Sequence, residues 1–313
     1  MSTATVPRGE VPTAPSERAR PDEEGVSVVI PAYNEEGGAA PVLEELLRVL
    51  EEKVAPAMPY EVIVVDDGSS DGTAAAVEPF VGERLRLVRH EVNSGYGAAI
   101  KTGVHHARYP WILITDADGT YPAEHIPDLL AHREGHAMVV GARTGEEAHV
   151  PLLRRPPKWV LRKLASYLSR REIPDLNSGL RVFRRDMARR FENILPDQFS
   201  YTTTITLVTF AAGLLVRYLP INYRRREGKS KIRPIADTLG FLKLIVRTIL
   251  YFDPLRVFLP LAAFFVVAAV AVAVLSYTLT GRVMDVTTVL LFVTGIHLLA
   301  LGMIADMLNR RLP

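Results

Sequence analysis

Residues 111–122 read WILITDADGTYP, and the fold class follows from this stretch and its surroundings. The apolar run at 111–115 predicts a short buried strand, which the polar residues after it bring to an end. Asp116 and Asp118 stand two residues apart, so in an extended chain both carboxylates point to one side and can face one ion. Carboxylate oxygens suit Mg²⁺ or Mn²⁺. Aspartates are also ordinary turn formers, so the pair alone leaves a metal site and a plain turn both open.

Alternating apolar strands and helices continue on both sides of this stretch. Residues 61–65 (EVIVV) predict another buried strand, which an acidic run at 66–73 ends. Residues 41–54 and 95–107 have the apolar spacing of helices. The pattern predicts an α/β fold with a mostly parallel sheet covered on both faces, and ligands bound at the carboxyl ends of the strands. The other expected strands are 26–30, 85–89 and 138–141.

The carboxy-terminal region has a different composition. Residues 258–280 contain 23 residues without a charge, which as a helix measure about 34 Å and exceed a bilayer core of about 30 Å. A second uncharged stretch, which contains His297, predicts a transmembrane hairpin with spans 258–280 and 286–307. A buried hairpin in a soluble core is the alternative. Before the hairpin, residues 236–256 predict an amphipathic helix at the membrane interface, with a buried core helix as the alternative.

The arginines around the hairpin predict its orientation. Four of them flank the pair of spans, and the short loop between the spans holds only Arg282. By the positive-inside rule the large domain and both termini lie in the cytoplasm, in a multi-pass membrane protein with two spans. The flanking residues are Arg247, Arg256, Arg310 and Arg311.

Composition and charge narrow the function classes. The 313 residues are 48% hydrophobic, which excludes a disordered chain, although the proline-containing residues 1–24 predict a disordered tail. With no Cys, the sequence excludes a disulfide framework, a Cys-based zinc site and a thiol nucleophile. Residues 1–150 hold 12 Lys and Arg against 25 Asp and Glu, whereas residues 151–313 hold 25 against 10. An acidic and a basic half suggest metal or sugar handling in one and phosphate or membrane-surface handling in the other.

Motifs in a fixed order carry a family resemblance. IPAYNEE (30–36), VVDDGSSDGT (64–73), NSGYGAAIKTG (93–103) and DADGTYP (116–122) follow one another at predicted strand ends. Together they resemble the inverting GT-A glycosyltransferases of family 2. LNSGLRVFRRD (176–186) and RRREGKSKI (224–232), followed by two spans, resemble the polyprenyl-phosphate group of that family, such as dolichol-phosphate mannose synthases and enzymes that glucosylate undecaprenyl phosphate. The resemblance implies a GT-A, Rossmann-like catalytic domain at 25–235, the interfacial helix at 236–256 and the hairpin at 257–313.

The resemblance also implies roles for single residues. Pro31, Tyr33 and Glu35 would line the nucleotide pocket, and Asp67 would contact the base or ribose. Asp116 and Asp118 would hold Mg²⁺ or Mn²⁺ with the donor diphosphate, which gives Asp118 a catalytic part. Relatives often have Gln two residues after the second aspartate, whereas this chain has Thr120.

Basic residues would serve the acceptor phosphate. Arg143 matches the family's position for an arginine on that phosphate, and Arg226 and Lys231 match a basic loop that closes over the phosphates and takes part in catalysis. Ser230 would add a hydrogen bond. Physically, guanidinium groups suit phosphate because they donate two parallel hydrogen bonds. A solvated basic face near anionic lipid is the alternative for most other basic residues. Nucleic acid is not expected as a partner, because no known binding module is present.

The implied reaction moves a hexose from a nucleotide-diphosphate sugar to a polyprenyl phosphate. UDP-glucose and GDP-mannose both fit as donors, and dolichyl and undecaprenyl phosphate both fit as acceptors. The alternatives are transfer to another lipid or to a polysaccharide, and a non-catalytic membrane scaffold. Membrane lipid is an expected partner, and self-association stays open.

Overall fold

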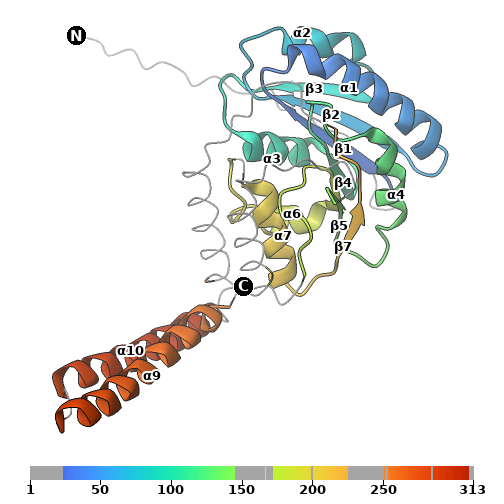
Figure 1. Ribbon diagram of the computed structural model, residues 1–313. Coiled ribbons are helices and arrows are strands. Elements are labelled where there is room, and N and C mark those ends of the chain that lie inside the picture. Colours follow the sequence, from blue (N-terminus) through green and yellow to red (C-terminus); the bar gives the residue numbers. More distant parts are fainter. Residues whose placement is uncertain are drawn as a thin grey trace, which may run out of the picture.

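A seven-stranded sheet forms the centre of the large domain (Figure 1). The computed structural model describes residues 24–144, 166, 172–198, 200–224, 250, 253–282 and 285–309. The order of strands across the sheet is β3-β2-β1-β4-β6-β5-β7. The strands are β1 (Val26–Ala32), β2 (Tyr60–Asp66), β3 (Leu85–Arg89), β4 (Trp111–Ile114), β5 (Met138–Ala142), β6 (Arg181–Arg184) and β7 (Val216–Pro220).

The central strands are buried on both faces. Every residue of β1 and β2 is buried, as expected for apolar runs in a sheet that has helices on both sides. β1 pairs in parallel with β2 and with β4, and β2 pairs in parallel with β3. The prediction of a mostly parallel α/β sheet is therefore confirmed.

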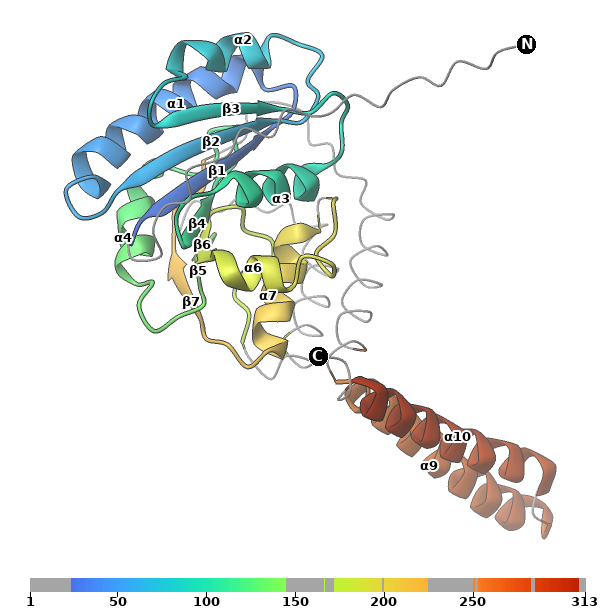
Figure 2. The same cartoon turned by 180° about the vertical axis from the view of Figure 1, so that it is seen from behind.

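Helices cover the two faces in separate groups (Figures 1 and 2). One group packs with the core that contains Leu43, Leu46 and Leu129, and the other with the core that contains Ile100, Phe183 and Tyr201. The first group comprises α1 (Glu36–Val49), its π-helical continuation (Leu50–Val54), α2 (Thr73–Val77), the 3₁₀ turns Glu78–Phe80 and Ala123–His125, and α4 (Ile126–Ala131). The second comprises α3 (Tyr96–His106), α6 (Arg185–Arg190) and α7 (Tyr201–Ala211).

Two strands depart from the expectation. β6 runs antiparallel to both β4 and β5, and β7 pairs in parallel with β5 at the edge. The sequence predicted neither strand. The chain turns between the end of α7 at Ala211 and the start of β7 at Val216. Gly213, at φ 73°, makes the turn between them.

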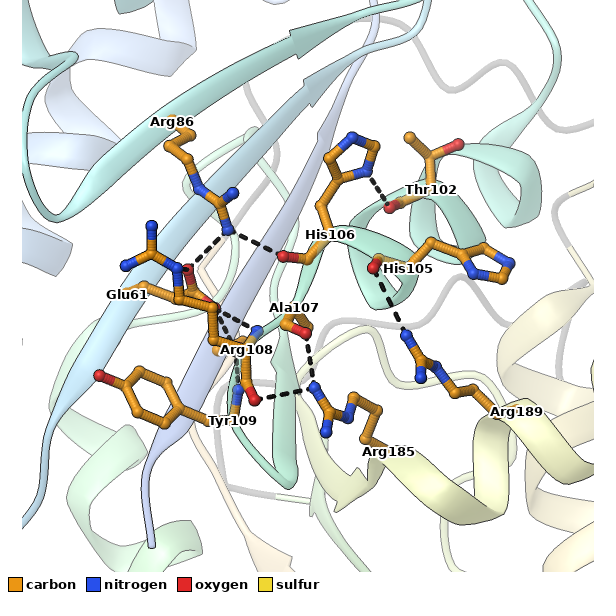
Figure 3. Close-up of polar contacts among 11 residues, drawn as sticks. Glu61, Arg86, Thr102, His105, His106, Ala107, Arg108, Tyr109, Arg185 and Arg189 are labelled. Carbon is orange, nitrogen blue, oxygen red and sulfur yellow. Dashed lines mark hydrogen bonds and ion pairs between the residues drawn. The ribbon is translucent and has the colours of Figure 1, made fainter. Parts of the chain in front are cut away.

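A buried carboxylate closes the edge of the sheet opposite to the carboxyl ends of its parallel strands (Figure 3). Glu61 is 4% exposed and accepts hydrogen bonds from the Arg86 guanidinium (2.7 Å) and from the Arg108 backbone N–H (2.6 Å). Arg86 and Arg185 also donate to carbonyl groups at and just after the end of α3. Cations at a helix C-terminus are favourable, so this network fixes α3 against the sheet.

Two long helices project away from the domain (Figures 1 and 2). α9 (Leu255–Thr280) and α10 (Asp285–Asn309) are both long and apolar enough to cross a membrane. They pack closely because glycines of α10 face α9: a Cβ atom on Gly295 would lie 2.8 Å from a methyl carbon of Val266. The predicted amphipathic segment 236–256 and the predicted tail 1–24 lie almost entirely outside the described residues.

Candidate active site

The order in which the chain adds strands to the sheet reverses at β1. From β1 the chain adds β2 and β3 on one side and then returns to place β4 on the other. The loops after β1 and β4 therefore diverge, and in open α/β sheets this switch point is where ligands bind. Pro31 lies in β1, Tyr33 and Glu35 follow it, and Asp116 and Asp118 follow β4. The register pairs Val29 with Ile114, so both sets of residues leave the sheet at nearly the same level.

Neighbouring side chains orient both aspartates of the D-x-D pair. The Tyr96 hydroxyl donates to Asp116 Oδ1 at 2.9 Å. Burial, and then the negative charge of Asp116, raise the pKa of Tyr96, which keeps this hydroxyl a donor. The Thr120 hydroxyl and backbone N–H donate to Asp118 Oδ1, at 2.6 and 3.1 Å. Thr120, which stands where relatives often have Gln, thus acts on the second aspartate itself.

The backbone of Gly179 packs closely against the Asp116 carboxylate. A Cβ atom there would lie 2.7 Å from Asp116 Oδ2, so a larger residue would displace the carboxylate. The Gly179 N–H donates to the Tyr121 hydroxyl at 2.7 Å. The 176–186 motif is thereby attached to the loop after β4.

This pair of carboxylates fits a divalent cation. Magnesium sites that also bind substrate phosphates commonly use one or two protein carboxylates, with waters and phosphate oxygens completing the shell. Within the described part of the chain, no group of three or more acidic or histidine side chains forms a complete cage. Asp116 and Asp118 would therefore hold Mg²⁺ or Mn²⁺ together with a ligand that brings its own oxygens.

Hydrogen bonds between two loops fix the segment that follows β1. Asn34 has a positive φ of 52°, and its Oδ1 accepts from the Ser70 N–H at 2.9 Å. The Glu35 N–H donates to the Thr73 hydroxyl at 2.9 Å. A Cβ atom on Gly38, in the first turn of α1, would lie 3.0 Å from the Ala117 carbonyl oxygen. The start of α1 and the D-x-D loop are thus adjacent.

Asp67 is buried directly after β2, and its carboxylate makes three hydrogen bonds. Its Oδ1 accepts from the Ser94 N–H at 2.9 Å and lies 2.7 Å from His90 Nδ1. Its Oδ2 accepts from the Gly95 N–H at 2.8 Å. Gly95 adopts φ 107°, a conformation that suits glycine. Asp67 therefore fixes the 93–95 loop beside the D-x-D residues.

Arg143 lies directly after β5 in a half-buried ion pair. Its Nε and Nη2 donate to Asp175 Oδ2 and Oδ1 at 2.7 and 2.9 Å. Its guanidinium also lies 5.3 Å from the centre of the Tyr223 ring, which packs edge-on against Tyr121. The predicted acceptor arginine is therefore linked through two aromatic rings to the loop after β4.

The segment that follows β7 contacts the loop after β4. The Arg224 N–H donates to the Thr120 carbonyl at 3.0 Å, and its guanidinium contacts both oxygens of Glu45, at 2.7 and 3.2 Å. Glu45 also accepts from the Ala123 N–H at 3.2 Å. Arg226, Ser230 and Lys231 follow directly but lie outside the described residues.

The structure thus gathers Pro31, Tyr33, Glu35, Asp67, Asp116, Asp118 and Arg143 at one edge of the sheet. Sequence reasoning missed Asp175 and the roles of Tyr96, Tyr121 and Gly179. Tyr96 and Gly179 stand inside motifs that the sequence singled out, so the motifs were a usable signal for them. Nothing local marks Asp175, because its partner Arg143 is 32 residues away.

Comparison with known proteins gives relatives that are named as dolichyl-phosphate or undecaprenyl-phosphate sugar transferases. A dolichyl-phosphate hexose transferase from Haloferax volcanii is 29% identical over 229 residues, which cover 72% of this chain and 94% of that protein. The human dolichyl-phosphate beta-glucosyltransferase is 29% identical over 250 residues, covering 72% and 75% of the two chains. An undecaprenyl-phosphate 4-deoxy-4-formamido-L-arabinose transferase from Shewanella sediminis is 35% identical over 168 residues, covering 52% and 49%.

Solved structures support the fold. Glucosyl-3-phosphoglycerate synthase from Mycobacterium tuberculosis, in complex with Mn²⁺, UDP-glucose and phosphoglyceric acid, matches with a TM-score of 0.56 and 19% identity, over 73% of this chain and 80% of that one.

Two family domains together account for most of the chain. Residues 253–310 match the GtrB C-terminal hairpin, in agreement with the two apolar helices, and the protein is membrane-anchored. Residues 27–191 match glycosyl transferase family 2, with the switch-point aspartates inside the matched region. The chain is a glycosyltransferase and belongs to glycosyl transferase family 2.

Proposed function

We propose that this protein transfers a hexose from a nucleotide-diphosphate sugar to a polyprenyl phosphate, with inversion at the anomeric carbon. The observation that carries the proposal is the pair Asp116 and Asp118 at the switch point of a chain that also has a two-helix membrane hairpin. The names of the relatives, which act on dolichyl or undecaprenyl phosphate, support this acceptor class. Two relatives are named as hexose or beta-glucosyl transferases, which makes glucose the first sugar to test.

The roles proposed for the donor side are those that the family resemblance implies, and the positions of the residues at the ends of β1, β2 and β4 support them. Asp116 and Asp118 would hold Mg²⁺ or Mn²⁺, which when bound neutralises charge on the donor diphosphate. Tyr96 and Thr120 would keep the two carboxylates oriented. Pro31, Tyr33 and Glu35 would line the nucleotide pocket, and Asp67 would contact the base or ribose from the end of β2.

On the acceptor side, the chain supplies cations rather than a general base. A phosphate monoester is already largely anionic at pH 7, because its second pKa is about 6. One of its oxygens would attack the anomeric carbon while the bond from that carbon to the nucleoside diphosphate breaks. Arg143 would orient the lipid phosphate. Arg226, Lys231 and Ser230 would stabilise the phosphates from the segment that begins two residues after Arg224.

The orientation of the protein forms part of the proposal. With the large domain in the cytoplasm, the hairpin would hold the site beside the inner leaflet, where the acceptor phosphate lies at headgroup depth. The nucleotide sugar would reach the site from the cytoplasm.

The test is a transfer assay with purified full-length protein in detergent. Radiolabelled UDP-glucose and GDP-mannose are offered separately with undecaprenyl or dolichyl phosphate, in Mg²⁺, Mn²⁺ or EDTA. We expect metal-dependent label in an acid-labile lipid from one donor. We expect Asp116→Asn to lower turnover at least about 100-fold, the scale of losing one electrostatic stabiliser of the leaving group.

A matched control separates chemistry from folding. Asp128→Asn makes the same change at an exposed position of α4 and should keep full activity. Label that is insensitive to Asp116→Asn, or the absence of lipid-linked label with every donor and acceptor pair from a protein that binds nucleotide, would contradict the proposal.

A further inference from the structure

Arg181, the first residue of β6, is a fully buried cation. Its Nε and Nη2 both donate to the Ser178 carbonyl oxygen, and its Nη1 donates to the Thr202 carbonyl and the Thr206 hydroxyl at 2.8 and 2.9 Å. Within the described part of the chain, no carboxylate forms an ion pair with this guanidinium. Removing a charged group from water is costly, and here hydrogen bonds to neutral groups offset that cost.

The hydrogen bonds of Arg181 join two elements that lie behind the D-x-D loop. Ser178 belongs to the segment that enters β6, whereas Thr202 and Thr206 belong to the first turns of α7. A guanidinium is planar and presents its donors in fixed directions, so it holds the Ser178 carbonyl at a set distance from α7. The Ser178 hydroxyl also donates to the Gly141 carbonyl of β5 at 2.5 Å. The backbone at residue 178 is therefore fixed from two sides.

The position of Ser178 determines that of Gly179, which contacts Asp116. A Cβ atom on Gly179 would lie 2.7 Å from Asp116 Oδ2 and 3.0 Å from Oδ1, so the carboxylate lies directly against the glycine backbone. The charge of Arg181 also acts on Tyr96, whose hydroxyl donates to Asp116. Burial raises the pKa of Tyr96, and the positive charge of Arg181 offsets part of that rise. Arg181 is thus connected to both neighbours that orient this carboxylate.

We infer that Arg181 is a positioning residue for the metal-binding carboxylate of Asp116. It acts through the Ser178 carbonyl and the Gly179 backbone rather than by touching the ion. The inference rests on the proposed function, because it takes Asp116 and Asp118 as the residues that hold Mg²⁺ or Mn²⁺. Replacing a residue that orients a metal ligand commonly lowers metal affinity about 10- to 100-fold. Since Arg181 acts through one further residue, we expect the lower end of that range.

Binding of Mn²⁺ by the full-length protein in detergent tests this role without turnover. The bound ion is measured from the loss of the electron paramagnetic resonance signal of free Mn²⁺ at a fixed UDP concentration, with UDP alone as the blank. Arg181→Lys keeps the charge but has one nitrogen in place of three, so it cannot hold both Ser178 and α7. Mn²⁺ affinity should fall about 10-fold, whereas UDP binding in EDTA should stay at the wild-type value. An unchanged Mn²⁺ affinity, or an equal loss of the two affinities, would overturn the inference.

Two threonines of α7 provide a matched pair of variants that leave Arg181 in place. Thr206 and Thr209 are both buried, and each hydroxyl donates to the carbonyl four residues earlier, at 2.8 and 2.6 Å. Thr206 also accepts from Arg181, whereas Thr209 contacts the Met187 sulfur. Thr206→Val should lower Mn²⁺ affinity about 3-fold, the scale of one hydrogen bond. Thr209→Val should leave it unchanged. Equal Mn²⁺ affinities in these two variants would refute the inference even if Arg181→Lys fails to fold.

Two further variants separate this inference from the proposed function. Gly179→Ala places a methyl group against Asp116 and should itself lower Mn²⁺ affinity. Adding Arg181→Lys should then change little, because both substitutions act on one contact, and fully additive losses would contradict the inference. Wild-type Mn²⁺ affinity in Asp116→Asn would show that the proposed metal site is wrong. A loss in Asp116→Asn without one in Arg181→Lys would overturn the positioning role alone.

Discussion

At the scale of single residues, Asp67, which we propose as a nucleotide contact, also stabilises the fold. Its two oxygens accept the N–H groups of Ser94 and Gly95. In Asp67→Asn the amide NH₂ must face one of these N–H groups, which leaves a buried donor without an acceptor. We expect a loss of about 1–3 kcal/mol in the free energy of unfolding, together with weaker nucleotide binding. Thermal unfolding and nucleotide titration measure the two effects. A variant with the stability and affinity of Asp128→Asn would disprove this role.

The Asp175 carboxylate makes stability depend on pH. Burial raises the pKa of Asp175, but the hydrogen bonds and positive charge of Arg143 outweigh burial and hold that pKa below its usual value. The stabilisation is therefore present above the unfolded-state pKa of about 3.9 and is lost as the pH falls through the lower folded-state pKa. Asp175→Asn should cost roughly 1–3 kcal/mol at pH 7 and less at pH 3, because the stabilisation begins to fall once the pH is below about 3.9. Unfolding temperatures at both pH values check this, and an equal deficit at the two would refute it.

At the scale of elements, the Glu45–Arg224 pair connects α1, the loop after β4 and the end of β7. The hydrogen bonds from Arg224 hold the pKa of Glu45 below its usual value, so the carboxylate is charged at neutral pH. The pair is partly exposed, and such pairs stabilise a fold by only about 0–1 kcal/mol. Its effect should be on position, because Arg224 begins the segment that leads to Arg226 and Lys231.

Glu45→Gln should therefore lower kcat/KM for the lipid phosphate about 10-fold, because small misplacements of binding groups are costly. KM for the nucleotide sugar and the unfolding temperature should change little. Glu44→Gln, at the exposed neighbouring position, is the matched control. The double variant Glu45→Arg with Arg224→Glu should recover part of the loss. Equal losses for donor and acceptor would contradict a positioning role at the root of the basic segment.

The strands that the sequence predicted have local apolar patterns, whereas the strands that it missed depend on contacts with distant parts of the chain. β1, β2 and β4 are apolar runs with turn-forming residues behind them, so local patterning suffices. β6 begins with Arg181, which is fully buried and donates to the Ser178 and Thr202 carbonyls at 3.0 and 2.8 Å. In a sequence, an arginine suggests an exposed position. Arg181 is buried in contact with α7, and a local pattern does not contain that contact. β7 pairs with β5 across 78 residues of chain, beyond the reach of local patterns.

The candidate site follows the same division at the scale of the whole molecule. The predicted aspartates lie where expected because parallel strands all deliver their carboxyl ends to one edge. Thr120 supports Asp118 from within the same motif, whereas Tyr96 and Gly179 come from other motifs. β6 lies between β4 and β5 and brings Gly179 next to Asp116. No single-sequence pattern states that order of strands. The roles of Arg226, Ser230 and Lys231 stay predictions from their motif.

The whole molecule must also face the correct side of its membrane, and its arginines make that testable. Four arginines flank the hairpin, whereas Arg282 is the only Lys or Arg in its connecting loop. Loops rich in Lys and Arg stay in the cytoplasm. A single cysteine introduced as Arg282→Cys should therefore react with a membrane-impermeant maleimide added outside intact cells. Glu134→Cys, at an exposed position after α4, should react only after permeabilisation. The reverse labelling would place the large domain outside the cytoplasm. The candidate site would then have no access to cytoplasmic nucleotide sugars, and both the predicted orientation and the proposed reaction would be contradicted.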